Sequence, residues 1–257
     1  MPGSGWRKPM PSRPWGPASH RRGRPKPTRS ENEPMHGIRR APHLFLDRRS
    51  AGLELAEALM PHAAERPLVL ALPRGGVPVA FEAARMLHAE LDILLVRRIG
   101  APGHSGLALG AVIDGAHPQF VVNEEVMRQV RPPAGWFEAE MQRQSQELER
   151  ARQLYCREPP VPVADRCVIL VDDGIDTGSS VRAALKGLAK SAPGQLILAV
   201  PVAPRAVAQD LQPLVDELVC LAMPEPFDSI ARHYGDFDET TDREVADLLA
   251  EARHSAR

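Results

Sequence analysis

The fold of this chain is decided by one stretch, Val168-Ile169-Leu170-Val171-Asp172-Asp173-Gly174-Ile175-Asp176-Thr177-Gly178-Ser179-Ser180. Four apolar residues predict a short buried strand, two carboxylates end it, and the residues from Ser179 onward predict a helix. The glycine and hydroxyl turn leaves the N–H groups of the first helical turn without partners, so an anion can bind there with help from the helix dipole. The stretch therefore predicts a phosphate-binding turn.

The two carboxylates at the end of this strand add a second capability. Asp172 and Asp173 are placed to accept hydrogen bonds from ribose hydroxyls or to hold a hydrated divalent cation. The turn is not a Walker A loop, because the terminal Gly-Lys-Ser/Thr is missing. The alternative is structural, since an Asp-Asp step after a strand can simply cap a helix or hold a turn.

A second turn of the same kind follows an earlier apolar strand, Leu68–Leu72. It reads Pro73-Arg74-Gly75-Gly76 and leads into a helix predicted over residues 77–88. Two glycines at such a turn let the backbone approach a ligand closely, and an arginine beside them suits an anion. This turn is a second candidate anion site.

A third candidate segment follows the strand predicted over residues 92–98, which ends in Arg97-Arg98. The glycine-rich residues 100–106 come next, and with so little apolar content they are expected to form a mobile loop carrying His104. The alternatives are plain: arginines at a strand end are often solvated surface, and a lone histidine in a loop is often incidental.

Strands and helices alternate along the rest of the chain, and this predicts an α/β fold with a mainly parallel sheet flanked by helices. The sheet places its ligands outside the carboxyl ends of the strands, where all three candidate segments are expected to meet. Further strands are predicted at 109–113, 119–122, 195–200 and 217–222, and further helices at 47–63 (apolar face Leu53, Ala56, Leu59, Met60 and Ala63), 124–130, 136–155, 180–191, 204–211 and 242–252.

The thirteen residues quoted first resemble the phosphoribosyl-pyrophosphate (PRPP) signature of the type I phosphoribosyltransferases. Other segments look like a set of bacterial phosphoribosyltransferase-domain proteins without an assigned acceptor. They are Leu-Pro-Arg-Gly-Gly-Val-Pro-Val-Ala, Val-Arg-Arg-Ile-Gly-Ala-Pro-Gly, Gly-Ala-Val, Asn-Glu-Glu-Val and Pro-Glu-Pro-Phe. The likeness spans about residues 43–250 and implies a catalytic domain over residues 43–257 with a small C-terminal hood at about 223–257.

The resemblance also implies roles for individual residues. In the family the long turn binds the 5-phosphate of PRPP, the acidic pair binds ribose and orients Mg²⁺ indirectly through PRPP or water, and the first turn binds pyrophosphate. The residues concerned are Ile175, Asp176, Thr177, Gly178, Ser179 and Ser180 for the phosphate, Asp172 and Asp173 for ribose and metal, and Pro73, Arg74, Gly75 and Gly76 for pyrophosphate.

Catalysis is expected from three of the candidates. The resemblance places Arg97 and Arg98 near the leaving pyrophosphate and His104 on a closing lid, while Asp176 could accept the acceptor's proton as general base. The alternative for Asp176 is a carboxylate that only stabilises the turn. Two departures from the subgroup stand out, because the lid usually carries an acid where Gly106 stands and the turn often has a small residue in place of Asp176.

The function implied is Mg²⁺-dependent transfer of ribose 5-phosphate from PRPP to a nitrogenous base, with a purine-type base favoured and pyrophosphate released. The expected partners are these small substrates and a second copy of the chain, with neither nucleic acid nor a membrane. One rival is a PRPP-sensing regulator that binds nucleic acid and transfers little. Another is a reaction on a nucleotide with PRPP as product. Phe227, Tyr234 and Phe237 are candidates to stack on the base, or else to pack the final helix.

Composition sets the remaining bounds. With 257 residues, 43% of them hydrophobic and 25% charged, the chain is an ordinary globular protein, and no apolar run reaches the roughly 18–20 residues of a membrane span. The absence of a secretory signal and three scattered cysteines give a cytoplasmic location as the expectation. Residues 1–42 hold nine prolines and ten Lys/Arg against two Glu, and are expected to be a disordered basic arm unless translation starts at Met35.

Overall fold

Five parallel strands form the central sheet, in the order β2-β1-β6-β7-β8. The computed structural model describes residues 43–156 and 158–255, so the arm predicted over residues 1–42 lies outside the described part of the chain. The mainly parallel sheet that the alternating pattern predicts is confirmed. Its strands are β1 (Leu68–Ala71), β2 (Glu90–Ile93), β6 (Cys167–Val171), β7 (Gln195–Val202) and β8 (Glu217–Ala222).

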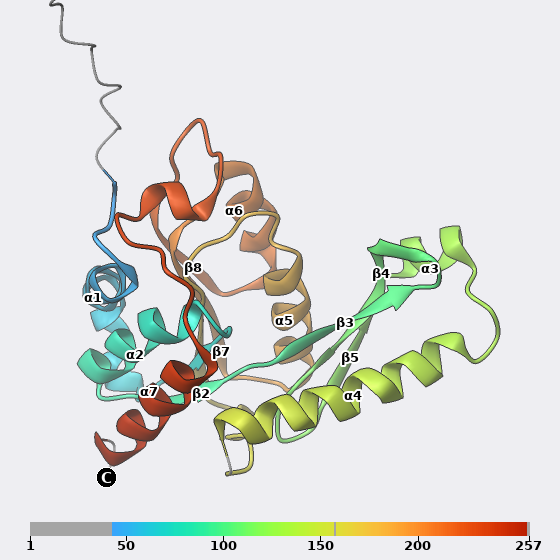
Figure 1. Cartoon of the computed structure of the whole chain (residues 1–257). Helices are drawn as coiled ribbons and strands as arrows, with labels where there is room; N and C mark the ends of the chain where they lie inside the picture. Colours follow the sequence, from blue (N-terminus) through green and yellow to red (C-terminus); the bar gives the residue numbers. More distant parts are fainter. Residues whose placement is uncertain (1–42, 157, 256–257) are drawn as a thin grey trace, which may run out of the picture. The chain divides into compact units, whose positions relative to one another are not determined.

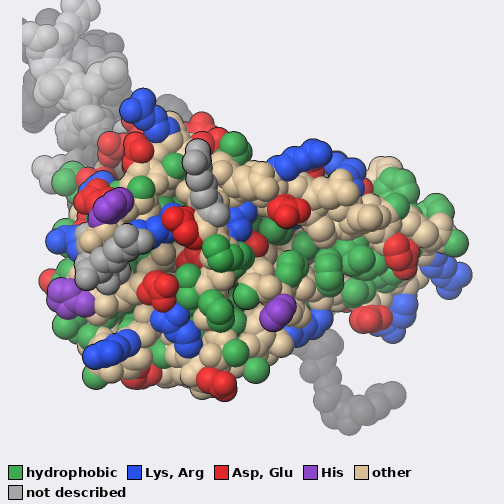
Figure 2. Space-filling view, turned by 90° about the horizontal axis from the view of Figure 1, so that it is seen from below, with side chains coloured by type: hydrophobic (Ala, Val, Ile, Leu, Met, Phe, Trp, Pro, Cys, Tyr) green, Lys and Arg blue, Asp and Glu red, His purple; other side chains and the backbone are tan. Residues whose placement is uncertain are grey.

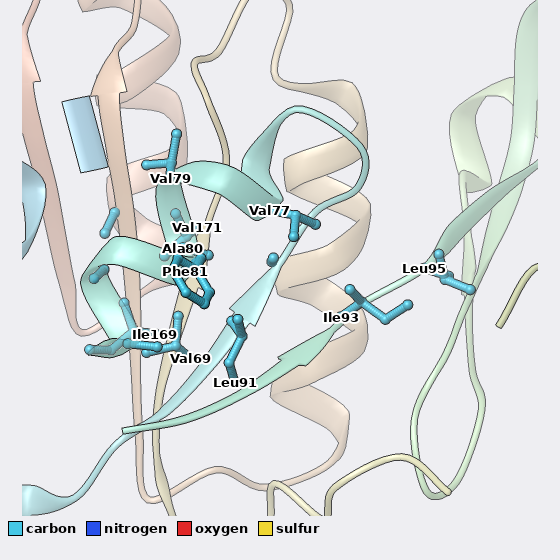
Figure 3. Close-up of a cluster of buried hydrophobic side chains, with 14 of the residues drawn as sticks. Val69, Val77, Val79, Ala80, Phe81, Leu91, Ile93, Leu95, Ile169 and Val171 are labelled. Atoms are coloured by element: carbon cyan, nitrogen blue, oxygen red, sulfur yellow. The ribbon is translucent and has the colours of Figure 1, made fainter. Parts of the chain in front are cut away.

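Helices cover both faces of this sheet. Helices α1 (Arg48–Leu59), α2 (Gly76–Leu87) and α7 (Asp242–Ser255) lie on one face, and α5 (Ser179–Lys190) and α6 (Arg205–Leu211) lie on the other (Figure 1). Each face carries its own buried cluster of aliphatic side chains. Figure 3 shows the first cluster, in which Val77, Ala80 and Phe81 of α2 meet Val69 of β1 and Ile169 of β6. Three short 3₁₀ helices complete the body at Met60–Glu65, Gln212–Leu214 and Ile230–His233.

Helix α1 begins where the sequence predicts but buries a different face. Asp47 caps it, since its side chain accepts from the Ser50 N–H and the Ser50 hydroxyl accepts from the Asp47 N–H. The predicted face is wrong at Leu53 and Met60, which are 39% and 46% exposed, because Leu55 lies fully inside instead. The rotation follows from close packing on α2, where a Cβ on Gly52 would lie 2.7 Å from the Val79 carbonyl oxygen.

A second, antiparallel sheet projects from the body (Figure 1). It consists of β3 (Val96–Ala101), β4 (His104–Ile113) and β5 (Gln119–Val122), and we call residues 96–122 the β-arm. The strand predicted over residues 92–98 is therefore wrong, because the chain leaves the central sheet after Ile93 and enters the β-arm at Val96.

The mobile loop predicted over residues 100–106 is also wrong. Residues 100 and 101 end β3 and His104 begins β4, with Ala101 paired to His104 across a two-residue turn. Pro102 and Gly103 form this turn, and Gly103 has a φ of +72°, which suits the third position of a type II turn. The Pro-Gly dipeptide is the hairpin signal that the low apolar content concealed.

Two helices follow the β-arm, α3 (Glu124–Val130) and α4 (Trp136–Tyr155), at the predicted positions. The Asn123 side chain caps α3 by accepting from the Val126 N–H. Helix α4 packs on β3, β4 and α7, with Leu148 buried. Arg152 of this helix is buried as well and bridges Asp92 and Asp114, so an ion cluster fastens α4 to the body.

Charged side chains of both signs are mixed over the surface shown in Figure 2, and hydrophobic side chains gather toward the end of that view that holds the β-arm and α4. In the described residues no helix is both long and apolar enough to cross a bilayer.

Candidate functional site

The predicted phosphate turn, residues 174–180, and the second glycine turn, residues 73–76, meet at the switch point of the central sheet. β1 and β6 are neighbours, but the chain leaves β1 toward β2 and leaves β6 toward β7, so their carboxyl ends open a crevice. A Cβ on Gly75 would lie 2.0 Å from an Asp173 carboxylate oxygen, and one on Gly76 would lie 2.9 Å from the Asp172 Cα. Only glycines let the two turns approach this closely.

The acidic pair is held from one side only. The Asp173 carboxylate is 2.7 Å from the Arg48 Nε, and both side chains are 12% exposed. Arg48 also donates to the Asp238 carbonyl at 2.7 Å and lies flat against the Phe237 ring, 3.7 Å from its centroid. Asp172 accepts only the Asp173 backbone N–H, at 2.9 Å, within the described chain. One carboxylate is thus paired and the other is not.

An aromatic cluster packs against Arg48 and the backbone of Asp173. The Tyr234 hydroxyl donates to the Asp173 carbonyl at 2.5 Å, and its ring packs on Phe45 and Phe237 with centroids 5.4 and 5.0 Å apart. The sequence left two roles open for Tyr234 and Phe237, stacking on a base or packing the final helix. In the structure Tyr234 and Phe237 pack around Arg48 and Asp173 at the start of α1.

Both carboxylates have perturbed acidities. Burial and the neighbouring charge of Asp173 raise the pKa of Asp172 well above its ordinary value. Burial also raises the pKa of Asp173, although the hydrogen bond and charge of Arg48 oppose this shift. A raised pKa means that the site holds more negative charge than its own groups can stabilise, and a cation bound there would relieve it.

The phosphate turn itself presents polar groups outward. Gly178 precedes α5 with a φ of +71°, and a Cβ there would lie 2.7 Å from Val207, so the turn requires glycine. Thr177, Ser179 and Ser180 are exposed at the start of this twelve-residue helix. The Asp176 side chain is exposed and makes no hydrogen bond or ion pair with the described residues.

Arg74 of the second turn points toward the C-terminal part of the chain. Its guanidinium contacts the Glu239 carboxylate and lies 3.6 Å from that of Asp242. The Asp242 carboxylate also accepts from the Tyr155 hydroxyl at 2.7 Å. Burial together with this hydrogen bond raises the pKa of Tyr155 to about 12.

The two candidate arginines of β3 separate. Successive strand residues face opposite sides of a sheet. Arg98 therefore lines a cavity beside Thr177 and Ser179, whereas Arg97 lies on the side of Tyr155, whose pKa its charge lowers. The sequence placed Arg97 and Arg98 together near one leaving group, but in the structure the two side chains face opposite sides of the β-arm. His104 stays exposed in the hairpin turn, with its Nδ1 3.1 Å from the Pro102 carbonyl oxygen.

The segment that follows β8 packs against the turn after the acidic pair. Ile230 leans on Gly174, since a Cβ on that glycine would lie 2.7 Å from its side chain. The rings of Phe227 and His233 pack with centroids 5.1 Å apart, and the His233 Nε2 is buried without a hydrogen-bond partner among the described residues. Phe227 packs at the edge of the same apolar cluster as Tyr234 and Phe237, but its ring contact is with His233.

Sequence reasoning missed Arg48 altogether, and for Tyr234 it missed the hydrogen bond to Asp173. Both lie far along the chain from the acidic pair, at separations of 125 and 61 residues. Arg48 follows a helix cap, where a basic residue is usually solvated. A local signal exists only for Tyr234, which belongs to an aromatic run in a chain with 4% aromatic residues.

The donor set fits Mg²⁺ shared with a ligand. The described residues contain no group of three or more His, Cys, Asp or Glu side chains that could hold a metal by themselves. Mg²⁺ in phosphate sites is typically bound through one or two carboxylates, with substrate phosphates and waters completing the shell. The unpaired Asp172 and the raised pKa of both carboxylates match that pattern.

Known proteins resemble this chain over most of its length. Two Mycobacterium tuberculosis proteins, from strains CDC 1551 / Oshkosh and H37Rv, are provisionally named phosphoribosyl transferases and are 38% identical over 210 residues. The match covers 81% of this chain and 47% of each relative, so the chain spans about half the length of these curated proteins. The crystal structure of TT1426 from Thermus thermophilus is 42% identical with a TM-score of 0.69, over 80% of this chain and 98% of that one.

No protein-family model matches the chain. The fold has its crevice at the carboxyl ends of β1 and β6, and this agrees with what the relatives are named. The chain is related over most of its length to proteins named as phosphoribosyl transferases, and its mainly parallel sheet flanked by helices is the fold that the resemblance to type I phosphoribosyltransferases implied.

Proposed function

We propose that residues 43–257 form a phosphoribosyltransferase domain, with residues 223–257 as its hood, that transfers ribose 5-phosphate from PRPP to a nitrogenous base. The observation that carries this proposal is the acidic pair, Asp172 and Asp173, between two glycine turns with only one arginine to balance it. A ligand with several hydroxyl groups and a bound metal ion fits such a site, because hydroxyls donate hydrogen bonds to carboxylates and the metal supplies the missing positive charge.

The donor is bound in three parts. Backbone N–H groups at the start of α5, from Thr177 to Ser180, hold the 5-phosphate with help from the helix dipole. Asp172 and Asp173 accept hydrogen bonds from the ribose diol. The turn Pro73–Gly76 receives pyrophosphate, for which Arg74 exchanges its contact with Glu239.

Mg²⁺ bound beside Asp172 and Asp173 supplies positive charge that lowers the cost of pyrophosphate departure. The protein's own contribution is to position the donor and to surround the leaving group with fixed charge from Arg74 and from Arg97 of the β-arm, whose charges both act on Tyr155.

The chemical step exchanges one bond at the anomeric carbon. The bond from this carbon to the pyrophosphate oxygen breaks, and its electron pair leaves with pyrophosphate. A ring nitrogen of the base forms the new bond, and the proton on that nitrogen passes to Asp176. An exposed carboxylate without protein partners is available for this transfer.

A purine-type base is favoured as acceptor. Asp176 lies in the turn that begins α5, and the hood packs Ile230 on the neighbouring Gly174. The segment that packs Ile230 on Gly174 also carries the Phe227 and His233 rings, and these supply aromatic surface for a base.

The test is pyrophosphate release from PRPP with Mg²⁺ and a panel of purines, pyrimidines and small amides. We expect turnover with at least one purine, and Asp176→Asn should lower kcat by about 10²–10⁴-fold while PRPP binding stays within about twofold. Asp210→Asn, an exposed carboxylate on α6, is the matched control and should keep full activity. Absence of turnover with every acceptor would exclude the transferase, and an active Asp176→Asn variant would remove that residue from the chemistry.

A further inference from the structure

A basic cavity adjoins the phosphate turn, and neither Asp172 nor Asp173 lines it. It has a volume of about 530 Å³ and lies between α5, α3 and the β-arm. Its lining includes Thr177, Ser179 and Ser180, so the cavity begins at the residues assigned to the 5-phosphate. Four basic residues and two acids line it, namely Arg98, Arg128, Arg182 and Lys186 with Glu124 and Glu125.

The basic side chains of α5 follow one helix face. Ser179, Arg182 and Lys186 are spaced i, i+3 and i+7, so they lie above one another toward the cavity. At 1.5 Å per residue, Lys186 begins about 10 Å from Ser179 along the axis, and its side chain tilts back toward the helix N-terminus. Ala183 lies between them and leaves space. A row of anionic groups starting at Ser179 would therefore approach the Lys186 ammonium.

The donors along this row are largely uncommitted. Lys186 makes no hydrogen bond or ion pair with the described residues, and Arg182 uses one nitrogen, at 3.3 Å from the Asp210 carbonyl oxygen. Arg128 uses its Nε on the Glu124 carbonyl at 3.1 Å. On the opposite wall, the Glu125 carboxylate already accepts from Gln129. Positive charge with free donors dominates the cavity.

We propose that this cavity binds the outer phosphates of a nucleoside 5′-di- or triphosphate whose first phosphate lies on the phosphate turn. The inference rests on the proposed function for the place of that first phosphate. PRPP carries a single phosphate on its C5 oxygen and leaves the cavity unfilled. A nucleoside di- or triphosphate therefore competes with PRPP and gains contacts that PRPP and nucleoside monophosphates do not make.

The experiment compares AMP and ADP, and GMP and GDP as a second pair, by calorimetric binding to the full chain without Mg²⁺. We expect the diphosphate to bind about tenfold more tightly than the monophosphate, since two or three charge-assisted hydrogen bonds are added at a partly exposed site. Lys186→Gln should remove most of this ratio. Arg243→Gln, at a side chain 91% exposed on α7, removes the same charge elsewhere and should leave the ratio unchanged.

Equal affinities for mono- and diphosphates, or a ratio that survives Lys186→Gln, would overturn the proposal. Inorganic pyrophosphate serves as a further arm: if it binds as tightly as ADP and loses as much affinity in Lys186→Gln, the cavity is a free-anion site and the nucleotide assignment fails. Binding needs no turnover, so its outcome is separate from that of the transferase assay. Circular dichroism of the Lys186→Gln variant confirms folding, because glutamine is also a good helix former.

Discussion

Two clusters of this molecule contain the same three groups, two aspartates and one arginine, and handle them differently. In the first, Arg152 lies between Asp92 and Asp114, with nitrogen to oxygen distances of 2.7 and 2.5 Å. In the second, Arg48 reaches Asp173 at 2.7 Å but makes no hydrogen bond or ion pair with Asp172 in the described chain. The first cluster is closed by the protein, and the second is left open on one side.

The difference teaches where a ligand is needed. Asp92 also accepts from the Val161 backbone N–H and Asp114 from that of Gly115, so both carboxylates of the closed cluster are paired in the folded chain, and the Arg152 Nε is the atom of this cluster left without a partner among the described residues. Burial raises the pKa of Asp114 against the opposing charge of Arg152. Asp172 experiences burial and the repulsion of an adjacent carboxylate. The open cluster thus keeps a charge imbalance that a metal and a diol can correct.

The largest effect is expected from opening the closed cluster. Arg152→Met should lower the free energy of unfolding by about 3–5 kcal/mol, because both buried carboxylates lose their cation. Urea denaturation measures this change. Arg143→Met on the same helix is the control, since that arginine is 61% exposed and its ion pair with Glu140 is solvated, so little or no change in the free energy of unfolding is expected. A loss below 1 kcal/mol for Arg152→Met would show that the cluster does not fasten α4.

A smaller effect is expected from removing the cation of the open cluster. Arg48→Met should cost about 1–3 kcal/mol, because one buried carboxylate loses its hydrogen bond while the methionine still covers Phe237. Mg²⁺ should stabilise this variant more than the wild type in thermal unfolding. Arg49→Met serves as control because Glu82 keeps Arg85 as a partner. Equal Mg²⁺ effects in wild type and Arg48→Met would separate the arginine from the metal site.

Neutralising Asp172 should act in the opposite direction. Its folded-state pKa is raised, so between the ordinary value near 4 and the raised value the folded chain binds more protons than the unfolded one, and stability falls as pH rises through that window. Asp172→Asn lacks this fall. Without metal or ligand its thermal midpoint should exceed that of the wild type by about 2–4 °C above the window and converge with it at lower pH.

The cost of that gain should appear in binding. An amide cannot replace the anionic oxygen beside the metal, so Asp172→Asn should bind PRPP with Mg²⁺ at least about tenfold more weakly in calorimetry. A variant that is less stable than the wild type at neutral pH would contradict the view of Asp172 as an uncompensated charge.

The smallest effect is expected from removing the Tyr234 hydroxyl, which donates to the Asp173 carbonyl. Tyr234→Phe removes the hydrogen bond to the Asp173 carbonyl and keeps the ring packing on Phe45, so the loss should be about 0.5–1.5 kcal/mol in urea denaturation. A larger loss would mean that the bond also positions the acidic pair, which a parallel change in the PRPP dissociation constant would reveal.

Much of the fold could be predicted because its signals are local. The four apolar residues before Asp172 predict a buried strand, and the capping residues Asp47 and Asn123 mark helix starts that the structure confirms. In the β-arm the strands predicted at residues 109–113 and 119–122 are confirmed, whereas residues 99–108 could not be predicted from apolar content, because they are glycine-rich and gain their partners only across the hairpin. The inward face of α1 likewise depended on how closely α2 approaches Gly52.

The sequence by itself determined the turn before α5, the acidic pair after β6 and the glycine turn after β1, because each is a run of adjacent residues whose backbone geometry follows from their own side chains. Only the tertiary structure decided that Arg48 balances Asp173 and not Asp172, that Arg97 and Arg98 face opposite sides, and that α5 forms one wall of a basic cavity. These facts join segments far apart in the chain. They follow from strand order and helix packing, which local sequence patterns do not specify.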